Sequence, residues 1–139
     1  MFQRSAHLKD IPGNSLLPFP NDRNVKLLAS PSIVRNTEHV AVGLVQIAPD
    51  HVHEEHEHAA EEVMYIIKGR GEVVIQGKER VLLKPETVVI LKPNERHMIK
   101  VTGAETLEIL WVYAPPGPEK KFVSGAGCPA LEEGESSYE

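Results

Sequence analysis

Residues 51–69 read HVHEEHEHAAEEVMYIIKG, a run of histidine and glutamate that leads into an apolar, strand-like segment and ends at a glycine. Residues i and i+2 of an extended chain point to the same side, so each His-x-His pair can direct both imidazoles at one ion. Two such pairs are present, His51/His53 and His56/His58. Because the pairs differ in parity, one continuous strand would face them in opposite directions. We therefore predict that only one pair faces a core.

Two further residues favour the second pair. Glu62 opens the apolar run EVMYIIK four residues after His58, and His97 opens another such run after the turn KPNER. Three imidazoles and one carboxylate on neighbouring strands suit a divalent transition metal, because imidazole binds Fe, Cu, Ni and Zn while the carboxylate adds tolerance for Mn. For His51 and His53 we favour solvated loop positions, since most His/Glu-rich segments are solvated.

The rest of the chain predicts an all-β, antiparallel sandwich or barrel. Short runs rich in Val, Ile and Leu recur between residues 25 and 114 with turn residues between them, which is the spacing of such folds. No window of helical length carries apolar residues at i, i+3 and i+4. The eight predicted strands are VKLLA, VAVGLVQIA, EVMYIIK, GEVVIQ, ERVLL, TVVIL, HMIKV and TLEILWVYA.

Two segments resemble the sequence motifs of the cupin family. Residues 56–69, HEHAAEEVMYIIKG, are similar to the first motif, in which His-x-His is followed by three residues, a Glu, six residues and a Gly. Residues 86–97, ETVVILKPNERH, resemble the second motif through Pro93 and His97. The resemblance implies a small jelly-roll barrel (a double-stranded β-helix), a dimer and one bound divalent transition metal ion. The ligands that it implies are His56, His58, Glu62 and His97.

Three glycines of the family pattern are replaced in this chain. Asp50 stands six residues before His56, Glu86 opens the second motif, and Asn94 follows the proline of that motif. None of these positions is a ligand in the family. The replacements therefore put the shape of the loops in question more than metal binding.

The ligand set predicts catalysis, because four protein ligands leave two adjacent octahedral positions for substrate, water or dioxygen. Glu62 is our first choice for the catalytic general base. Strand alternation places Met64, Ile99 and Trp111 on inward faces, where they would line an apolar substrate pocket, although core packing is the more common role of such residues. The mouth of the site is predicted to attract cations through four glutamates: Glu54, Glu55, Glu57 and Glu61.

Three kinds of function fit these observations. We favour a metal-dependent oxidoreductase of the dioxygenase type that acts on a small organic oxygen-containing substrate, with Fe²⁺ or Mn²⁺ ahead of Ni²⁺, Zn²⁺ or Cu²⁺. The segment LWVYAPPGPEKKF, residues 110–122, looks like the end of the barrel in quercetin-dioxygenase-like small cupins. A metal-dependent isomerase, decarboxylase, lyase or cyclase would use the same ion without oxygen. A non-catalytic small-molecule binding or sensor module is the third kind.

The length and the net charge of the chain limit the number of domains and the kinds of partner. A chain of 139 residues is long enough for one hydrophobic core. We divide the chain into an N-terminal arm at 1–24, a barrel at 25–116 and a C-terminal tail at 117–139. A net charge of -5 without a basic cluster argues against nucleic acid as a partner. The N-terminus lacks the apolar segment of a signal peptide and the longest apolar stretch is too short for a bilayer, so we predict a cytoplasmic protein. The single Cys128 permits no intrachain disulfide. We also predict a homodimer in which the N-terminal arm pairs with the neighbouring subunit and caps a sheet edge.

Overall fold

The computed structural model describes residues 1–11, 14–15 and 23–120, and these residues form strands and two short 3₁₀ turns with no α-helix. All eight predicted strands are confirmed. Two further strands, β1 and β4, were not predicted. The strands are β1 (Asn14–Ser15), β2 (Arg23–Ala29), β3 (Ala41–Ile47), β4 (Val52–His56), β5 (Glu61–Lys68), β6 (Gly71–Ile75), β7 (Glu79–Leu83), β8 (Val88–Leu91), β9 (His97–Val101) and β10 (Leu107–Ala114), and the 3₁₀ turns are η1 (Leu8–Asp10) and η2 (Pro118–Lys120).

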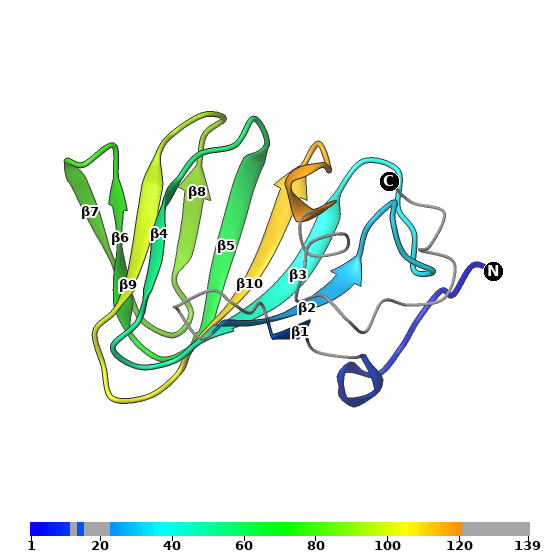
Figure 1. Cartoon of the computed structure of the whole chain (residues 1–139), viewed down its shortest axis with the longest axis horizontal. Helices are drawn as coiled ribbons and strands as arrows, with labels where there is room; N and C mark the ends of the chain where they lie inside the picture. The colour runs from blue at the N-terminus through cyan, green and yellow to red at the C-terminus, as the bar shows by residue number, and fades with distance from the viewer. Residues whose placement is uncertain (12–13, 16–22, 121–139) are drawn as a thin grey trace.

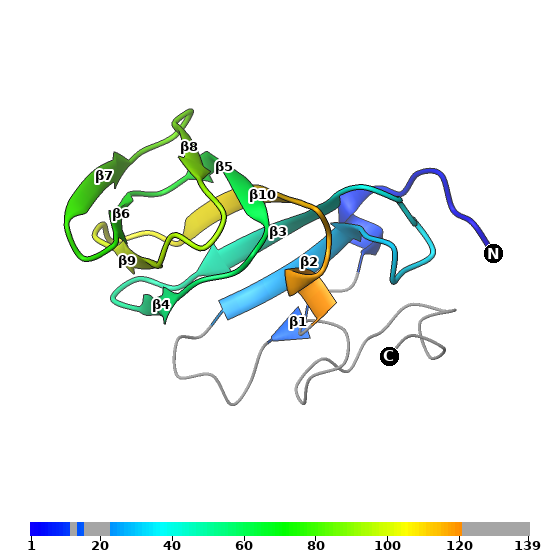
Figure 2. The ribbon, with the colours of Figure 1, turned by 90° about the horizontal axis from the view of Figure 1, so that it is seen from above.

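The strands form two antiparallel sheets. The larger sheet has the order β1-β2-β3-β10-β5-β8, and the smaller has the order β4-β9-β6-β7. The two sheets face each other around a shared interior at one end of the molecule, while β2 and β3 extend away from it (Figures 1 and 2). Every strand pair is antiparallel, which confirms the predicted jelly-roll architecture.

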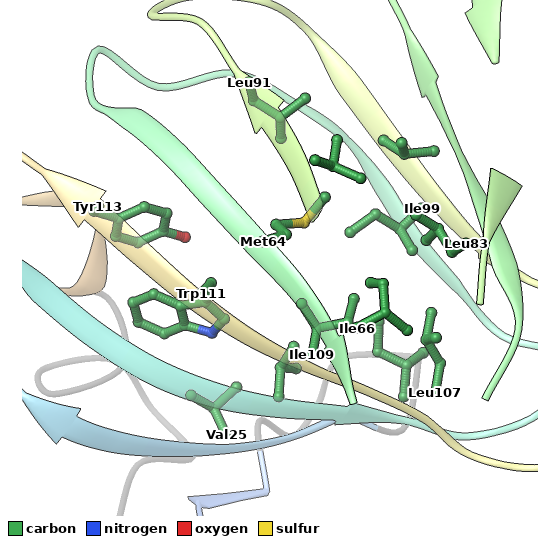
Figure 3. Packing of buried hydrophobic residues seen from close by; sticks show 14 of the residues in the cluster. Val25, Met64, Ile66, Leu83, Leu91, Ile99, Leu107, Ile109, Trp111 and Tyr113 are labelled. Atoms are coloured by element: carbon green, nitrogen blue, oxygen red, sulfur yellow. The ribbon is translucent and has the colours of Figure 1, made fainter. Parts of the chain in front are cut away.

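Strand alternation decides which side chains enter the interior. Along β5, Glu62, Met64 and Ile66 are 5%, 1% and 0% exposed, whereas Val63, Tyr65 and Ile67 are 40%, 39% and 42% exposed. The inward face of β10 is buried in the same way, and its Ile109, Trp111 and Tyr113 side chains pack beside Met64 between the sheets (Figure 3). The period of two read from the sequence is thus confirmed for β5 and β10.

At the three positions where the family pattern has glycine, the backbone still adopts a conformation that glycine favours. Asp50, Glu86 and Asn94 have φ angles of 64°, 72° and 65°, in the left-handed region that residues other than glycine rarely adopt. The loops therefore turn at these positions without glycine. Asn94 also joins its turn to the metal-ligand segment, because its backbone N–H donates to the His58 carbonyl at 2.8 Å.

Both ends of the described chain contact the barrel. At the start, the Gln3 N–H donates to the Val34 carbonyl at 2.8 Å, and the Arg35 guanidinium donates to the Gln3 side chain at 2.7 Å. At the other end the buried Glu119 carboxylate accepts hydrogen bonds from the Ser30 hydroxyl at 2.9 Å and from the Gly117 N–H at 2.7 Å.

The described part of the predicted tail therefore lies against the barrel. The remainder of the tail, including Cys128, lies outside the described residues. None of the described segments forms a helix of the length and apolar character that crossing a membrane requires.

Candidate metal centre

Three histidines from separate parts of the chain meet in the interior. His56 ends β4 and lies opposite His97, the first residue of β9, in the smaller sheet. His58 follows in the connection to β5. One ring nitrogen from each of the three residues lies within 4.8 Å of the others, and His97 is 1% exposed. The sequence-predicted imidazoles are thus gathered at one point, which we call the histidine cluster.

Backbone carbonyls orient two of these rings. His58 Nδ1 lies 2.9 Å from the Ala60 carbonyl oxygen, and His97 Nδ1 lies 2.9 Å from the Glu95 carbonyl oxygen. A carbonyl only accepts hydrogen bonds, so in each ring Nδ1 carries the proton. In the neutral ring the Nε2 lone pair can then coordinate a metal ion. Metal-binding histidines usually donate a hydrogen bond from their other ring nitrogen in this way.

Glu62 supplies a carboxylate beside the cluster from the opposite sheet. It is the second residue of β5, is buried, and its Oε1 lies 3.1 Å from His58 Nε2 and 3.8 Å from His97 Nε2. It is not a member of the group of three mutually close nitrogens. The structure therefore brings together all four residues that the cupin resemblance implies as ligands.

The donor set fits a divalent transition metal ion. Donor atoms about 2.1 Å from one ion are separated by about 3.0 to 4.2 Å, the range between adjacent and opposite octahedral positions. The distances of 3.1 and 3.8 Å between Glu62 and the two Nε2 atoms fall in this range. Two lone-pair atoms that approach this closely also require a proton or a cation between them. Imidazole with carboxylate is a set that Fe, Mn, Ni, Zn and Cu accept, so the residues do not select one metal.

His53 also faces the cavity, so its assignment as a solvated loop residue is wrong. The register between β4 and β9 shifts between His53, opposite Ile99, and His56, opposite His97. This bulge places one extra residue on β4, so an odd and an even position share a face. The His53 and His56 rings stack with their centroids 4.3 Å apart. His51 stays at the start of the segment, where its Nδ1 lies 2.7 Å from the Pro49 carbonyl.

His56, His97 and Glu62 line a small cavity of about 20 Å³, which we call the central cavity. The predicted pocket residues Met64, Ile99 and Trp111 all contribute to its wall, and Figure 3 shows them converging from β5, β9 and β10. The described residues that line it are Arg23, Val25, Val45, His53, His56, Glu62, Met64, His97, Ile99, Ile109, Trp111 and Tyr113.

Tyr113 brings a neutral phenol to this cavity. Its ring lies against Trp111 and meets the His58 ring edge-on, with centroid separations of 4.5 and 4.9 Å. Burial raises the pKa of Tyr113 well above its usual range, and the nearby carboxylates of Glu62 and Glu119 raise it further, while Arg23 lowers it. The hydroxyl therefore keeps its proton at physiological pH and remains a hydrogen-bond donor.

Three of the glutamates predicted to lie at the mouth pair with two basic side chains. Arg96 contacts Glu55 at 3.2 Å and Glu57 at 3.7 Å, and Lys92 contacts Glu61 at 3.6 Å. These pairs are exposed, so each contributes little to stability, but together they reduce the negative field that the sequence predicted.

An antiparallel double-stranded β-helix with a histidine cluster between its sheets defines a metal-binding class of small barrel proteins. The chain belongs to the cupin family: the family model described as "Cupin domain" matches residues 43–113, about half of the sequence. This match covers the histidine cluster and the strands that support it. Among curated proteins, none matches the sequence.

Solved structures share the fold at low sequence identity. The polyketide cyclase RemF from Streptomyces resistomycificus superposes with a TM-score of 0.72 at 14% identity, over 84% of this chain and 82% of that one. An RmlC-like cupin from Shewanella frigidimarina gives 0.71 at 10% identity, over 85% and 96%. A predicted oxalate decarboxylase from Thermotoga maritima gives 0.67 at 21% identity, over 80% and 98%. At these identities the comparisons establish the fold alone.

Proposed function

We propose that this protein is a metal-dependent cupin enzyme of the dioxygenase type, with a small organic oxygen-containing substrate. The observation that carries the proposal is the convergence of His56, His58 and His97, with Glu62 beside them, next to the central cavity. His56, His58, His97 and Glu62 would hold one ion, with Fe²⁺ or Mn²⁺ preferred. When bound, that ion supplies Lewis acidity toward the oxygens of a substrate and a site for dioxygen.

The residues of the chain provide the remaining chemistry. Glu62 places a carboxylate oxygen inside the central cavity, where it can accept a proton from a bound substrate, so we assign it as the general base. Tyr113, held neutral, can donate a hydrogen bond to an oxygen that becomes more negative during the reaction. The apolar walls formed by Met64, Ile99 and Trp111 exclude water around these groups and strengthen both interactions.

A second candidate uses the same site without oxygen. The chain shares its fold with proteins whose names include a polyketide cyclase and a predicted oxalate decarboxylase. A proton-transfer reaction such as isomerisation, decarboxylation, elimination or cyclisation needs a base and a polarising ion, and Glu62 with the histidine cluster offers both.

Oxygen uptake separates the two candidates. We expect protein purified without added metal, then loaded with Fe²⁺ or Mn²⁺, to consume oxygen with at least one member of a panel of diketones, flavonols and catechols. An oxygen electrode gives the rate, and we expect at least a tenfold excess over the metal-free protein. If the loaded protein binds its metal but consumes no oxygen with any member of the panel, the second candidate replaces the first. If it binds no metal, both candidates fail and a non-catalytic binding module is favoured.

We also propose a homodimer. The sequence predicts an interface through the N-terminal arm, but β1 of that arm pairs with β2 of its own chain, so we propose the outer face of β5 and β8 as the interface instead. Val63 lies opposite Ile90 and Tyr65 lies opposite Val88 across these strands, and all four side chains are 39–58% exposed. Such a contiguous apolar patch is typical of an interface. Because β8 is an edge strand, a second copy can extend the sheet across a two-fold axis while it covers the patch.

Light scattering on a size-exclusion column checks this proposal. We expect a mass twice the chain mass of 15.4 kDa and a shift of Ile90→Asp toward the single-chain mass. The control is Leu82→Asp, at an equally apolar exposed position on β7, which should leave the mass unchanged. A single-chain mass for the unaltered protein would contradict the dimer. The cytoplasmic location stays a prediction from the sequence.

A further inference from the structure

A second cavity, which we call the outer groove, lies outside the barrel on the outer face of the larger sheet. Its volume of about 520 Å³ exceeds that of the central cavity and lies in the range of roughly 300 to 1,000 Å³ that is typical of small-molecule sites. The N-terminal segment and η1 lie beside β2 and β3 at this face (Figures 1 and 2). Of the described residues, none lines both cavities, so the outer groove is separate from the histidine cluster.

The floor of the outer groove is apolar, which is unusual for the outward face of a sheet. An antiparallel sheet that is solvated on one face normally carries polar side chains there. Here the outward positions of four neighbouring strands hold aliphatic residues, and the adjacent residue on each strand faces the core. Leu44 is only 5% exposed although it points away from the core, whereas Ile67 at the border of the groove is 42% exposed. The floor consists of Leu28, Leu44, Leu110 and Ile67.

The N-terminal segment forms the opposite wall. It is attached to the barrel at Gln3, as described above, and at Leu8, whose carbonyl accepts a hydrogen bond from Lys26 Nζ at 3.2 Å. Residues 4–6, between these attachments, line the groove, and Leu8 and Ile11 extend its apolar surface. The groove therefore exists because a segment attached at two points lies over an aliphatic surface.

The outer groove carries opposite charges at its two ends. Arg35, which binds Gln3, donates to the Leu28 carbonyl near the end of β2, and Arg4 directly follows Gln3 in the chain. Glu108 lies toward the other end, opposite Gln46 of β3. No ion pair joins Arg4 to an acidic side chain within the described part of the chain, and its guanidinium is exposed. The groove thus offers an exposed cation at one end of an aliphatic surface.

We propose that the outer groove binds an aliphatic monocarboxylate of medium chain length, with its carboxylate at Arg4 and its chain along the leucines of the floor. A guanidinium pairs with a carboxylate through two parallel N–H···O bonds. Each methylene that moves from water onto the aliphatic surface adds affinity. Glu108 disfavours a second negative charge at the far end, so a dicarboxylate of the same length fits less well.

Calorimetric titration of the full chain with butanoate, hexanoate, octanoate and octanedioate tests the proposal. We expect the affinity to rise about threefold with each added methylene, near the increment for its burial. Octanoate should bind more tightly than octanedioate. Arg4→Gln should weaken octanoate binding about threefold, because a partly exposed ion pair contributes modestly. The control is Arg70→Gln, which removes another exposed arginine, between β5 and β6, and should leave the affinity unchanged.

The position of the bound chain supplies the second readout. We expect intermolecular nuclear Overhauser effects between octanoate and the Leu110 methyl groups, and none to the Met64 methyl group of the central cavity. Ala6→Phe narrows the groove from an exposed position on the N-terminal segment and should weaken octanoate further. Contacts to Met64, or an affinity independent of chain length and of Arg4, would overturn the inference. Binding by Ile90→Asp alone would also overturn it, because a second copy would then be the occupant of this face. Equal affinity with and without Mn²⁺ is expected, so the result is independent of oxygen uptake.

Discussion

Replacement of His97 by alanine is expected to lower the metal content of the purified protein at least tenfold. His97 is the most buried member of the histidine cluster, at 1% exposure, and it contacts both His56 and Glu62. Loss of one imidazole removes a ligand whose orientation the Glu95 carbonyl has already fixed, so the remaining groups must bind the ion with fewer bonds. Elemental analysis of protein equilibrated with equal concentrations of Fe²⁺, Mn²⁺ and Zn²⁺ measures the effect.

Two further variants make this result interpretable. His39→Ala removes an exposed histidine that stands apart from the cluster and should leave the metal content unchanged. His58→Ala removes a ligand from a connection rather than from a strand, so it tests the site if the cavity left by His97→Ala unfolds the protein. Metal content that stays at the original level in both cluster variants would show that the imidazoles are not the ligands.

The strands and the histidine cluster were predictable because their patterns are local. Alternation along Glu62, Met64 and Ile66 gives the inward face directly, and the spacing from His56 to Glu62 is short enough to be read as one motif. The left-handed turn at Glu86 was open to question, since glutamate carries no signal for a positive φ angle. That conformation is imposed by the surrounding fold, in which the Glu86 N–H donates to the Ile66 carbonyl at 2.7 Å.

The errors arose where tertiary structure changes a local rule. His53 was assigned to solvent because, in a regular strand, positions 53 and 56 point to opposite faces. A bulge brings both side chains to the same face, and this bulge has no signal in the sequence. Arg23 was missed because a charged residue beside prolines and asparagines is typical of an exposed arm. Its burial depends on the pairing of β2 with β3, a contact between segments distant in the chain. The ion pairs of Arg96 with Glu55 and Glu57 are non-local for the same reason.

Replacement of Gly43 by alanine is expected to destabilise the protein by about 3 kcal/mol, at the upper end of what overpacking of a core usually costs. Gly43 of β3 lies opposite Trp111 of β10, and a Cβ atom on Gly43 would stand 2.0 Å from Cζ2 of the indole. The indole has little freedom to move away, because the Tyr113 ring is stacked against it with a centroid separation of 4.5 Å. For a domain of this size we expect the midpoint of thermal unfolding to fall on the order of 10 °C.

Gly103→Ala is the matched control, because a Cβ there meets only the Arg70 side chain at an ordinary 3.5 Å, and we expect little change in stability. A double-mutant cycle identifies the contact that is responsible. In a Trp111→Leu background the indole is absent, so Gly43→Ala should cost much less than it does alone. An equal cost in both backgrounds would show that Trp111 does not set the requirement for glycine.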